Sequence, residues 1–179
     1  MTVPHLNHAT RQITCTAVYC GPAGAGKSTS LRYLGGRARS GAAPGAGTGG
    51  EALSLELGTI SGYAVRFQLY ALPSDAADPV RMLMLNGADG LVFVADSRAV
   101  CFDSNRGCFE KLTGAIASDL PVVVQCNKQD LPSALLVPAD RLAAALAPGR
   151  PGFPSDALHG AGVYEAFAAL SGLVMARFA

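Results

Sequence analysis

A glycine-rich stretch at residues 21–29, GPAGAGKST, has the residue types and spacing that hold a phosphate chain. Its glycines let main-chain N–H groups converge on phosphate oxygens, Lys27 can reach the β- and γ-phosphates, and the Ser28 hydroxyl can ligate Mg²⁺. An apolar run at 13–20 and a helical pattern at 28–34 flank it, which disfavours the alternative of a plain glycine-rich turn. The residues expected at this phosphate site are Gly21, Ala23, Gly24, Ala25, Gly26, Lys27, Ser28 and Thr29.

A second motif, Asn127-Lys128-Gln129-Asp130, follows an apolar run at 121–126 that is typical of a buried parallel strand. The Asp130 carboxylate can accept hydrogen bonds from N1–H and the 2-amino group of guanine. Adenine offers neither donor and would leave a buried acceptor unpaired, at a cost of about 1–3 kcal/mol. The Lys128 stem can lie over the ring, and Asn127 can bridge base and phosphate loop. A lone copy of this motif is more often a solvated turn, but the carboxyl end of a strand is where ligands of open α/β sheets bind. Together, the two motifs predict a guanine-nucleotide site.

The composition indicates one globular domain spanning residues 1–179. With 14 basic and 13 acidic side chains, the formal net charge of +1 predicts no attraction to nucleic acid or to an anionic membrane surface. No apolar run reaches the roughly 18 residues of a spanning helix, and the polar amino terminus lacks a signal-peptide pattern. The five cysteines are an odd number, and three lie in or beside apolar runs. We therefore expect reduced thiols in a cytoplasmic protein.

Apolar runs alternate with helical patterns along the chain. Strands are expected at residues 13–20, 52–57, 64–72, 90–95, 121–126 and 156–158, and helices at 28–34, 79–85, 109–117, 139–146 and 163–178. The second and third strands form an antiparallel hairpin in this prediction. The alternation predicts an α/β fold of three layers, in which helices cover both faces of a mostly parallel, six-stranded sheet. Residues 35–50 hold seven glycines and a proline, which leaves two hypotheses, a mobile surface loop or a nucleotide-sensing switch.

The order of these parts resembles the Ras-like small GTPases of the P-loop GTPase superfamily, and the detail is most similar to the bacterial MglA family of polarity switches in cell motility. The segments that carry the resemblance are 16–29, 57–73, 86–97, 121–135 and 160–167, and RFQLYALP at 66–73 is the most specific.

The resemblance implies a G domain that binds GTP or GDP with Mg²⁺. It makes Thr48 the metal-ligating switch threonine, and it places the backbone of Ala157, Leu158 and His159 behind the guanine. It further implies a monomer that meets effector proteins and a Roadblock-type dimer as activator.

Two departures from the family pattern concern catalysis. Ser74 and Asp75 stand where Ras-like proteins carry glycine and the water-orienting glutamine, and Ala71 replaces the aspartate that holds a Mg²⁺-bound water. Gly47 stands where the family has its switch arginine. The catalytic candidates are therefore Lys27, Ser74 and Asp75, and hydrolysis is expected to be slow.

Three hypotheses of function remain open at this stage. The first is a slow GTPase switch, the second a degenerate scaffold that holds GDP or GTP, and the third a P-loop ATPase or small-molecule kinase. Asp96, which follows the run at 90–95, is interpreted as a helix-capping or structural carboxylate.

Overall fold

The computed structural model describes residues 5–37 and 51–178. The strands are β1 (His5–Asn7), β2 (Gln12–Cys20), β3 (Ala52–Ile60), β4 (Tyr63–Ala71), β5 (Gly90–Asp96), β6 (Val122–Asn127) and β7 (Gly152–Pro154). The helices are α1 (Lys27–Arg37), α2 (Asp78–Asn86), α3 (Phe102–Thr113), α4 (Ala139–Leu146) and α5 (Val163–Met175). Short 3-10 turns are η1 (Ala99–Cys101), η2 (Ser133–Leu135) and η3 (Ala176–Phe178).

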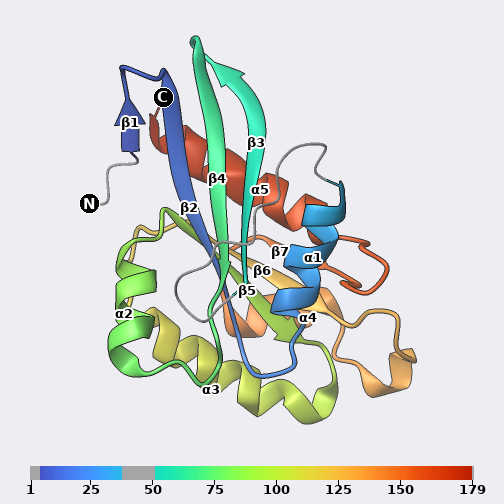
Figure 1. Cartoon of the computed structure of the whole chain (residues 1–179). Coiled ribbons are helices and arrows are strands. Elements are labelled where there is room, and N and C mark those ends of the chain that lie inside the picture. Colours follow the sequence, from blue (N-terminus) through green and yellow to red (C-terminus); the bar gives the residue numbers. More distant parts are fainter. Residues whose placement is uncertain (1–4, 38–50, 179) are drawn as a thin grey trace.

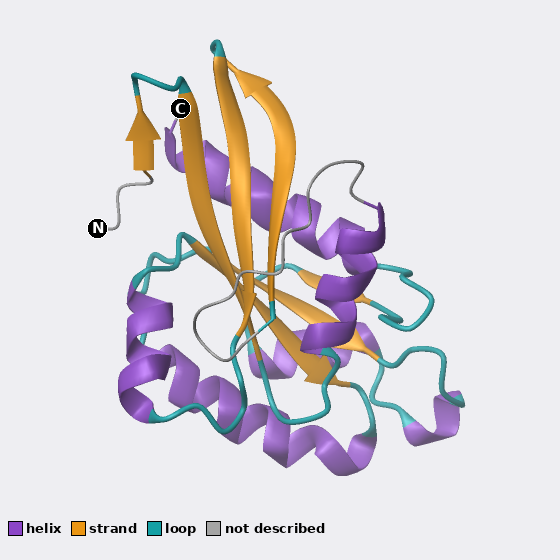
Figure 2. Ribbon diagram, in the orientation of Figure 1, coloured by secondary structure: helices purple, strands orange, loops and turns teal. Residues whose placement is uncertain are grey.

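The seven strands form a single sheet in the order β3-β4-β2-β5-β6-β7, with β1 paired to β2 beside that path. Strands β4, β2, β5, β6 and β7 run parallel, whereas β3 is antiparallel to β4 and β1 is antiparallel to β2. Figures 1 and 2 show the β3–β4 hairpin projecting beyond the short strands β6 and β7. In the sheet, β2 lies between β4 and β5. The chain passes from β2 through α1 and β3 to β4 on one side of β2, and then through α2 to β5 on the other side. The carboxyl end of β2 is therefore a switch point, where such sheets bind ligands.

Two apolar cores lie on opposite faces of the sheet. Helices α1 and α5 cover one face, and α2, α3 and α4 cover the other. The central strand β5 is buried over its whole length, as a parallel strand covered on both faces should be. The expected three-layer α/β fold is therefore confirmed.

Five of the six expected strands form, but the strand expected at 156–158 is wrong. The last strand is β7, which begins at Gly152 and pairs with β6 from Val124 to Cys126. Its glycine and proline residues are typical of a loop. Gly152 is nevertheless required there, because a Cβ atom at this position would lie 2.3 Å from the Cβ of Ala143 on α4. Asp156 instead begins a turn that its own carboxylate caps.

The sheet has seven strands rather than six, because β1 was not expected. This strand is only three residues long, and two of them are polar. It exists through antiparallel pairing with β2, in which His5, Leu6 and Asn7 lie opposite Thr14, Ile13 and Gln12. So short a segment has no periodicity that a sequence pattern could reveal.

Helix α3 begins seven residues before the expected 109–117 and ends at Thr113. Its buried residues are Asn105, Phe109 and Leu112, so a polar side chain interrupts the apolar stripe. Helix α1 extends through Arg37. The first three residues of the segment 35–50 are therefore helical, and the remainder lies outside the described residues.

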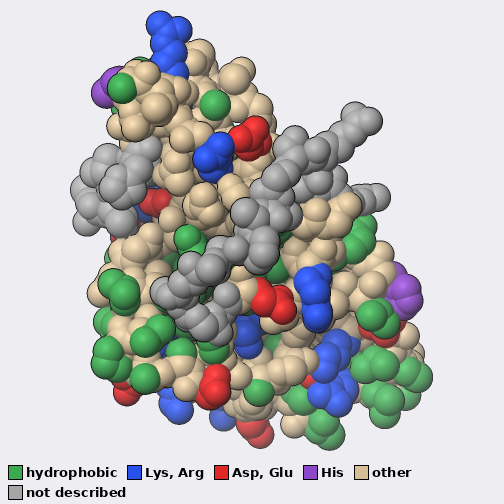
Figure 3. Space-filling model, in the orientation of Figure 1, with side chains coloured by type: hydrophobic (Ala, Val, Ile, Leu, Met, Phe, Trp, Pro, Cys, Tyr) green, Lys and Arg blue, Asp and Glu red, His purple; other side chains and the backbone are tan. Residues whose placement is uncertain are grey.

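Basic and acidic side chains are interspersed over the face of the molecule shown in Figure 3, in keeping with a formal net charge of +1. All five cysteines are free, and Cys15, Cys20 and Cys126 are buried. Within residues 5–37 and 51–178, no helix is long and apolar enough to cross a bilayer.

The core under α5 provides a test of the packing. Phe167 is 1% exposed and meets Phe67 of β4 edge to face, with ring centroids 5.5 Å apart. Phe167→Ala should lower the free energy of unfolding by about 3–5 kcal/mol, because it leaves a cavity in the core. Tyr164→Ala on the exposed side of the same helix is the matched control and should change it by less than about 1 kcal/mol. Urea unfolding measures both, and equal effects would contradict this packing.

Candidate functional site

The loop between β2 and α1 needs glycine at two positions. Gly21 has φ +141°, and a Cβ atom there would lie 2.2 Å from the carbonyl oxygen of Val94 on β5. Gly26 has φ +111°, and its Cβ would lie 2.1 Å from Nδ2 of Asn127. Backbone with such φ values is strained for any residue with a side chain. The predicted phosphate loop thus folds tightly against two neighbouring strands.

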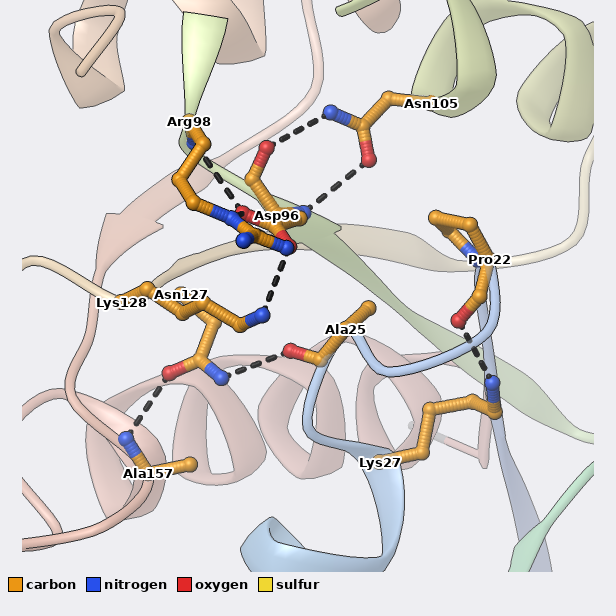
Figure 4. Close-up of polar contacts among 9 residues, drawn as sticks. All are labelled: Pro22, Ala25, Lys27, Asp96, Arg98, Asn105, Asn127, Lys128 and Ala157. Carbon is orange, nitrogen blue, oxygen red and sulfur yellow. Dashed lines mark hydrogen bonds and ion pairs between the residues drawn. The ribbon is translucent and has the colours of Figure 1, made fainter. Parts of the chain in front are cut away.

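Lys27 begins α1, and its ammonium group folds back over the loop. Its Nζ donates hydrogen bonds to the carbonyl oxygens of Gly21 and Pro22, each at 2.9 Å, and Figure 4 shows the bond to Pro22. Burial lowers the pKa of this ammonium, and the nearby Asp75 carboxylate is among the groups that oppose the shift. A cation held beside a glycine-rich loop suits a phosphate ligand.

A cavity of about 470 Å³ opens beside this loop. Its lining includes the predicted phosphate-site residues Gly24, Gly26, Lys27, Ser28 and Thr29. The other wall comes from the β3–β4 hairpin and the loop that follows it, and consists of Glu51, Ala71, Leu72, Pro73, Ser74 and Asp75. The structure therefore brings the phosphate loop and the two catalytic candidates of the 72–75 loop to one cavity.

Asn127, at the end of β6, joins three loops (Figure 4). Its Nδ2 donates to the carbonyl oxygen of Ala25 at 2.7 Å, and its Oδ1 accepts from the main-chain N–H of Ala157 at 2.8 Å. Asn127 is only 3% exposed. Asn127 is thus hydrogen-bonded to the phosphate loop and to the loop after β7, while its expected contact with a base stays a prediction.

Asp130 and Lys128 differ sharply in their surroundings. Asp130 is exposed, and it has no hydrogen bond or ion pair with any residue that the structure describes. Lys128 has φ +73°, and its Nζ lies 2.7 Å from Oδ2 of Asp96. Burial tends to raise the pKa of Asp96, but hydrogen bonds from Arg98 and Lys128 outweigh it and hold the pKa well below its usual range. The base motif thus contains a cation that is already held in an ion pair, Lys128, and a carboxylate, Asp130, that can still accept hydrogen bonds.

The stretch of Ala157, Leu158 and His159 lies beside the base motif, because Ala157 is bonded to Asn127. The main-chain N–H groups of Leu158 and His159 donate to Oδ1 of Asp156 at 3.0 and 3.2 Å, and the His159 ring contacts Oδ2 of the same carboxylate. Leu158 is 72% exposed. The role of this stretch behind a purine stays a prediction.

The loop after β4 lies between two cavities. Ser74 and Asp75, both exposed, line the cavity described above and a larger one of about 610 Å³ that reaches α3. Thr48, the expected metal-ligating switch residue, lies outside the described residues.

Sequence reasoning missed Glu51 as a site residue. Glu51 precedes β3, its carbonyl oxygen accepts a hydrogen bond from the N–H of Ala71 at 2.9 Å, and the residue lines the phosphate-loop cavity. It directly follows the glycine-rich segment, and no motif marks it. Only its pairing with Ala71 at the start of the hairpin brings it to the same cavity as Ser28.

The two glycines of the loop offer a matched pair of variants. Gly26→Ala should lower the free energy of unfolding by about 1–3 kcal/mol, because the new methyl group displaces the Asn127 amide from its partners. Gly24 has φ +69°, so Gly24→Ala should cost about 1–2 kcal/mol of backbone strain. A Cβ atom at this position would have nothing within 4 Å, so this loss should stay smaller than that of Gly26→Ala. Denaturant titration compares them, and a larger loss for Gly24→Ala would contradict the geometry.

The comparison with known proteins agrees with this geometry. The chain is 33% identical, over an alignment of 192 residues that covers 95% of each chain, to the "Mutual gliding-motility protein MglA" of Myxococcus xanthus (strain DK1622). No protein-family model matches the chain. A relative of this identity and coverage, joined to a phosphate loop and a base motif on one edge of a Ras-like sheet, establishes the family. The chain belongs to the MglA family of Ras-like small GTPases.

Proposed function

We propose that this protein binds GDP and GTP at the edge formed by the phosphate loop and the base motif, and that it hydrolyses GTP slowly as a molecular switch. The observation that supports this most directly is the contrast within the base motif. Asp130 keeps a carboxylate free of partners among the described residues, while Asn127 and Lys128 beside it are fixed by hydrogen bonds. A fixed loop that carries an unused acceptor suits the paired N–H donors of guanine.

The cavity residues fit a nucleotide phosphate chain and Mg²⁺. Lys27 would exchange its carbonyl partners for phosphate oxygens, because its ammonium group lies at the loop that would hold them. Mg²⁺ prefers oxygen ligands, and Ser28 and Glu51, which both line the cavity, would supply them. Thr48 remains the expected further ligand. When bound, the metal would neutralise charge on the β- and γ-phosphates.

Slow hydrolysis follows from the residues of the loop after β4. Asp75 would place a negative charge near the γ-phosphate, and an ionised carboxylate cannot donate a hydrogen bond to it. Glutamine at this position orients the attacking water in Ras-like enzymes. With no arginine at the family's switch position, a partner protein would have to supply the missing group.

The proposed setting is cytoplasmic, with a chain that is monomeric by itself and serves cell polarity or motility. The name of the relative refers to gliding motility. A Roadblock-type activator and effector proteins would read the nucleotide state.

The scaffold hypothesis claims instead that a partner binds the GDP form and a GTP-analogue form equally well, which would leave no switch. ATP that displaces bound GDP as well as GTP does would favour the ATPase or kinase hypothesis.

Asp130→Asn tests the base assignment. The asparagine amide donates where the carboxylate accepted, so GDP affinity should fall about one-hundredfold. Xanthine carries a carbonyl oxygen in place of the 2-amino group, so the same variant should bind xanthosine diphosphate better than the wild-type chain does. Calorimetry with the two nucleotides measures both effects.

The matched control for this substitution is Asp140→Asn, an exposed aspartate on α4. It should leave both affinities unchanged. If Asp130→Asn holds GDP as firmly as the wild-type chain, the base site is misplaced and the proposed function fails.

Asp75→Gln tests the account of hydrolysis. Restoring an uncharged side chain that can orient water should raise the single-turnover rate of GTP cleavage by about tenfold. Asp75→Asn removes the negative charge but keeps the shorter side chain, so it separates the effect of charge from the effect of side-chain length. It should give less than half of that gain. A wild-type rate near one per second without a partner would contradict slow hydrolysis.

A further inference from the structure

Two residues at the carboxyl end of β5 contact two residues of the base motif at the end of β6. Lys128 Nζ lies 2.7 Å from Oδ2 of Asp96, and Gln129 Nε2 donates to Oγ of Ser97 at 2.7 Å. Main-chain bonds reinforce the pairing, because the N–H of Ser97 donates to the carbonyl oxygen of Asn127 at 3.0 Å. Asp96 and Ser97, which we call the β5 clamp, therefore hold both central residues of the motif.

Asp96 is fixed before any ligand arrives. Its side chain is 3% exposed, and its carboxylate accepts from Nε of Arg98 at 3.0 and 3.2 Å, from Nη2 at 2.7 Å and from Lys128 (Figure 4). Asn105 of α3, fully buried, locks the backbone of Asp96 by donating to its carbonyl oxygen at 2.8 Å and accepting from its N–H at 3.0 Å. A buried carboxylate saturated in this way cannot turn outward without leaving two cations unpaired.

The fixed carboxylate restricts the lysine that it holds. A lysine side chain is long and flexible, and it loses much rotamer freedom when it is ordered. Because Nζ of Lys128 is tied to Asp96, its apolar stem is already ordered, and only 25% of the side chain is exposed. Because the Lys128 side chain loses this conformational entropy during folding, the loss does not lower the affinity for a ligand. The Ser97–Gln129 bond fixes the residue directly before Asp130 in the same way.

We propose that Asp96 and Ser97 are positioning residues for base recognition. The β5 clamp holds the Lys128 stem as a preformed platform for the face of the purine, and it orients the segment that carries Asp130 toward the purine edge. This inference rests on the proposed guanine site and assigns the β5 clamp no contact with the phosphates.

The test uses Asp96→Asn, Lys128→Met and the double variant in the full chain, with GDP and inorganic triphosphate as probes. Asp96→Asn should weaken GDP binding about tenfold, because the lysine stem loses its anchor, and it should leave triphosphate binding unchanged. The double variant should bind GDP no more weakly than the weaker of the single variants, because both remove the same contact.

The control is Asp119→Asn, which breaks a 2.9 Å ion pair with Arg177 away from the site and should alter neither probe. Ser97→Ala provides a second arm should Asp96→Asn fail to fold, and it should weaken GDP binding about threefold with triphosphate binding unchanged. Circular dichroism establishes folding for each variant.

Four outcomes would overturn the inference. Equal losses for GDP and triphosphate would make the β5 clamp a general structural element, and effects that multiply in the double variant would show that Asp96 acts independently of Lys128. If the variants bind GDP as tightly as the wild-type chain does, the β5 clamp has no role in base recognition, although the proposed guanine site would remain. A wild-type chain that does not bind GDP would overturn the proposed function, and this inference with it.

Discussion

The side-chain amide of Asn127 is the contact on which the rest of the site depends. It is a buried group that donates to the phosphate loop at Ala25 and accepts from the loop after β7 at Ala157. A buried amide left unpaired costs more than its hydrogen bonds contribute in net terms, so the three loops form these bonds together or lose them together. The absence of a side chain at Gly26 leaves the room that this amide needs. The predicted base site and the predicted phosphate site are therefore parts of one connected edge.

Carboxylates around this edge differ according to which partners the fold gives them. Asp96 is buried and saturated by two cations, and Asp156 is occupied by its own turn. Asp130 and Asp75 are exposed, and within the described residues neither has a hydrogen bond or ion pair. A saturated carboxylate stabilises a loop, whereas one with free lone pairs can accept donors from a ligand. This division separates the groups that build the site from those available to a nucleotide.

The β3–β4 hairpin connects the phosphate-loop cavity to a projecting part of the molecule. Glu51 and Ala71 are bonded at the base of the hairpin, and both residues line the cavity. The strands then run together for eight matched pairs of residues, with one irregularity between Glu56 and Gly58. A ligand group that contacts this wall therefore contacts the hairpin itself. Such continuity would give the proposed nucleotide-dependent change a physical route along the hairpin.

Much of the fold could be predicted from local pattern. The continuous apolar runs of β2, β5 and β6 mark buried parallel strands, because a strand covered on both faces has little room for polar side chains. Strands β1 and β7 could not be predicted, since each is three residues long and exists only through pairing with a neighbour. The prediction placed the start of α3 too late in the chain, because buried Asn105 interrupts its apolar stripe. That asparagine satisfies the backbone of Asp96, a need that lies outside the helix.

The sequence by itself determined the phosphate loop, the base motif and the strands that precede them, because glycine spacing and apolar periodicity act over a few neighbouring residues. Tertiary structure decided which carboxylates are engaged and which are free. Asp96 is bonded to Lys128, and Glu51 lines the same cavity as Ser28. Both arrangements arise because segments distant in sequence end side by side in the sheet. Electrostatic and hydrogen-bond partnerships depend on distance in space, and no local pattern encodes that distance.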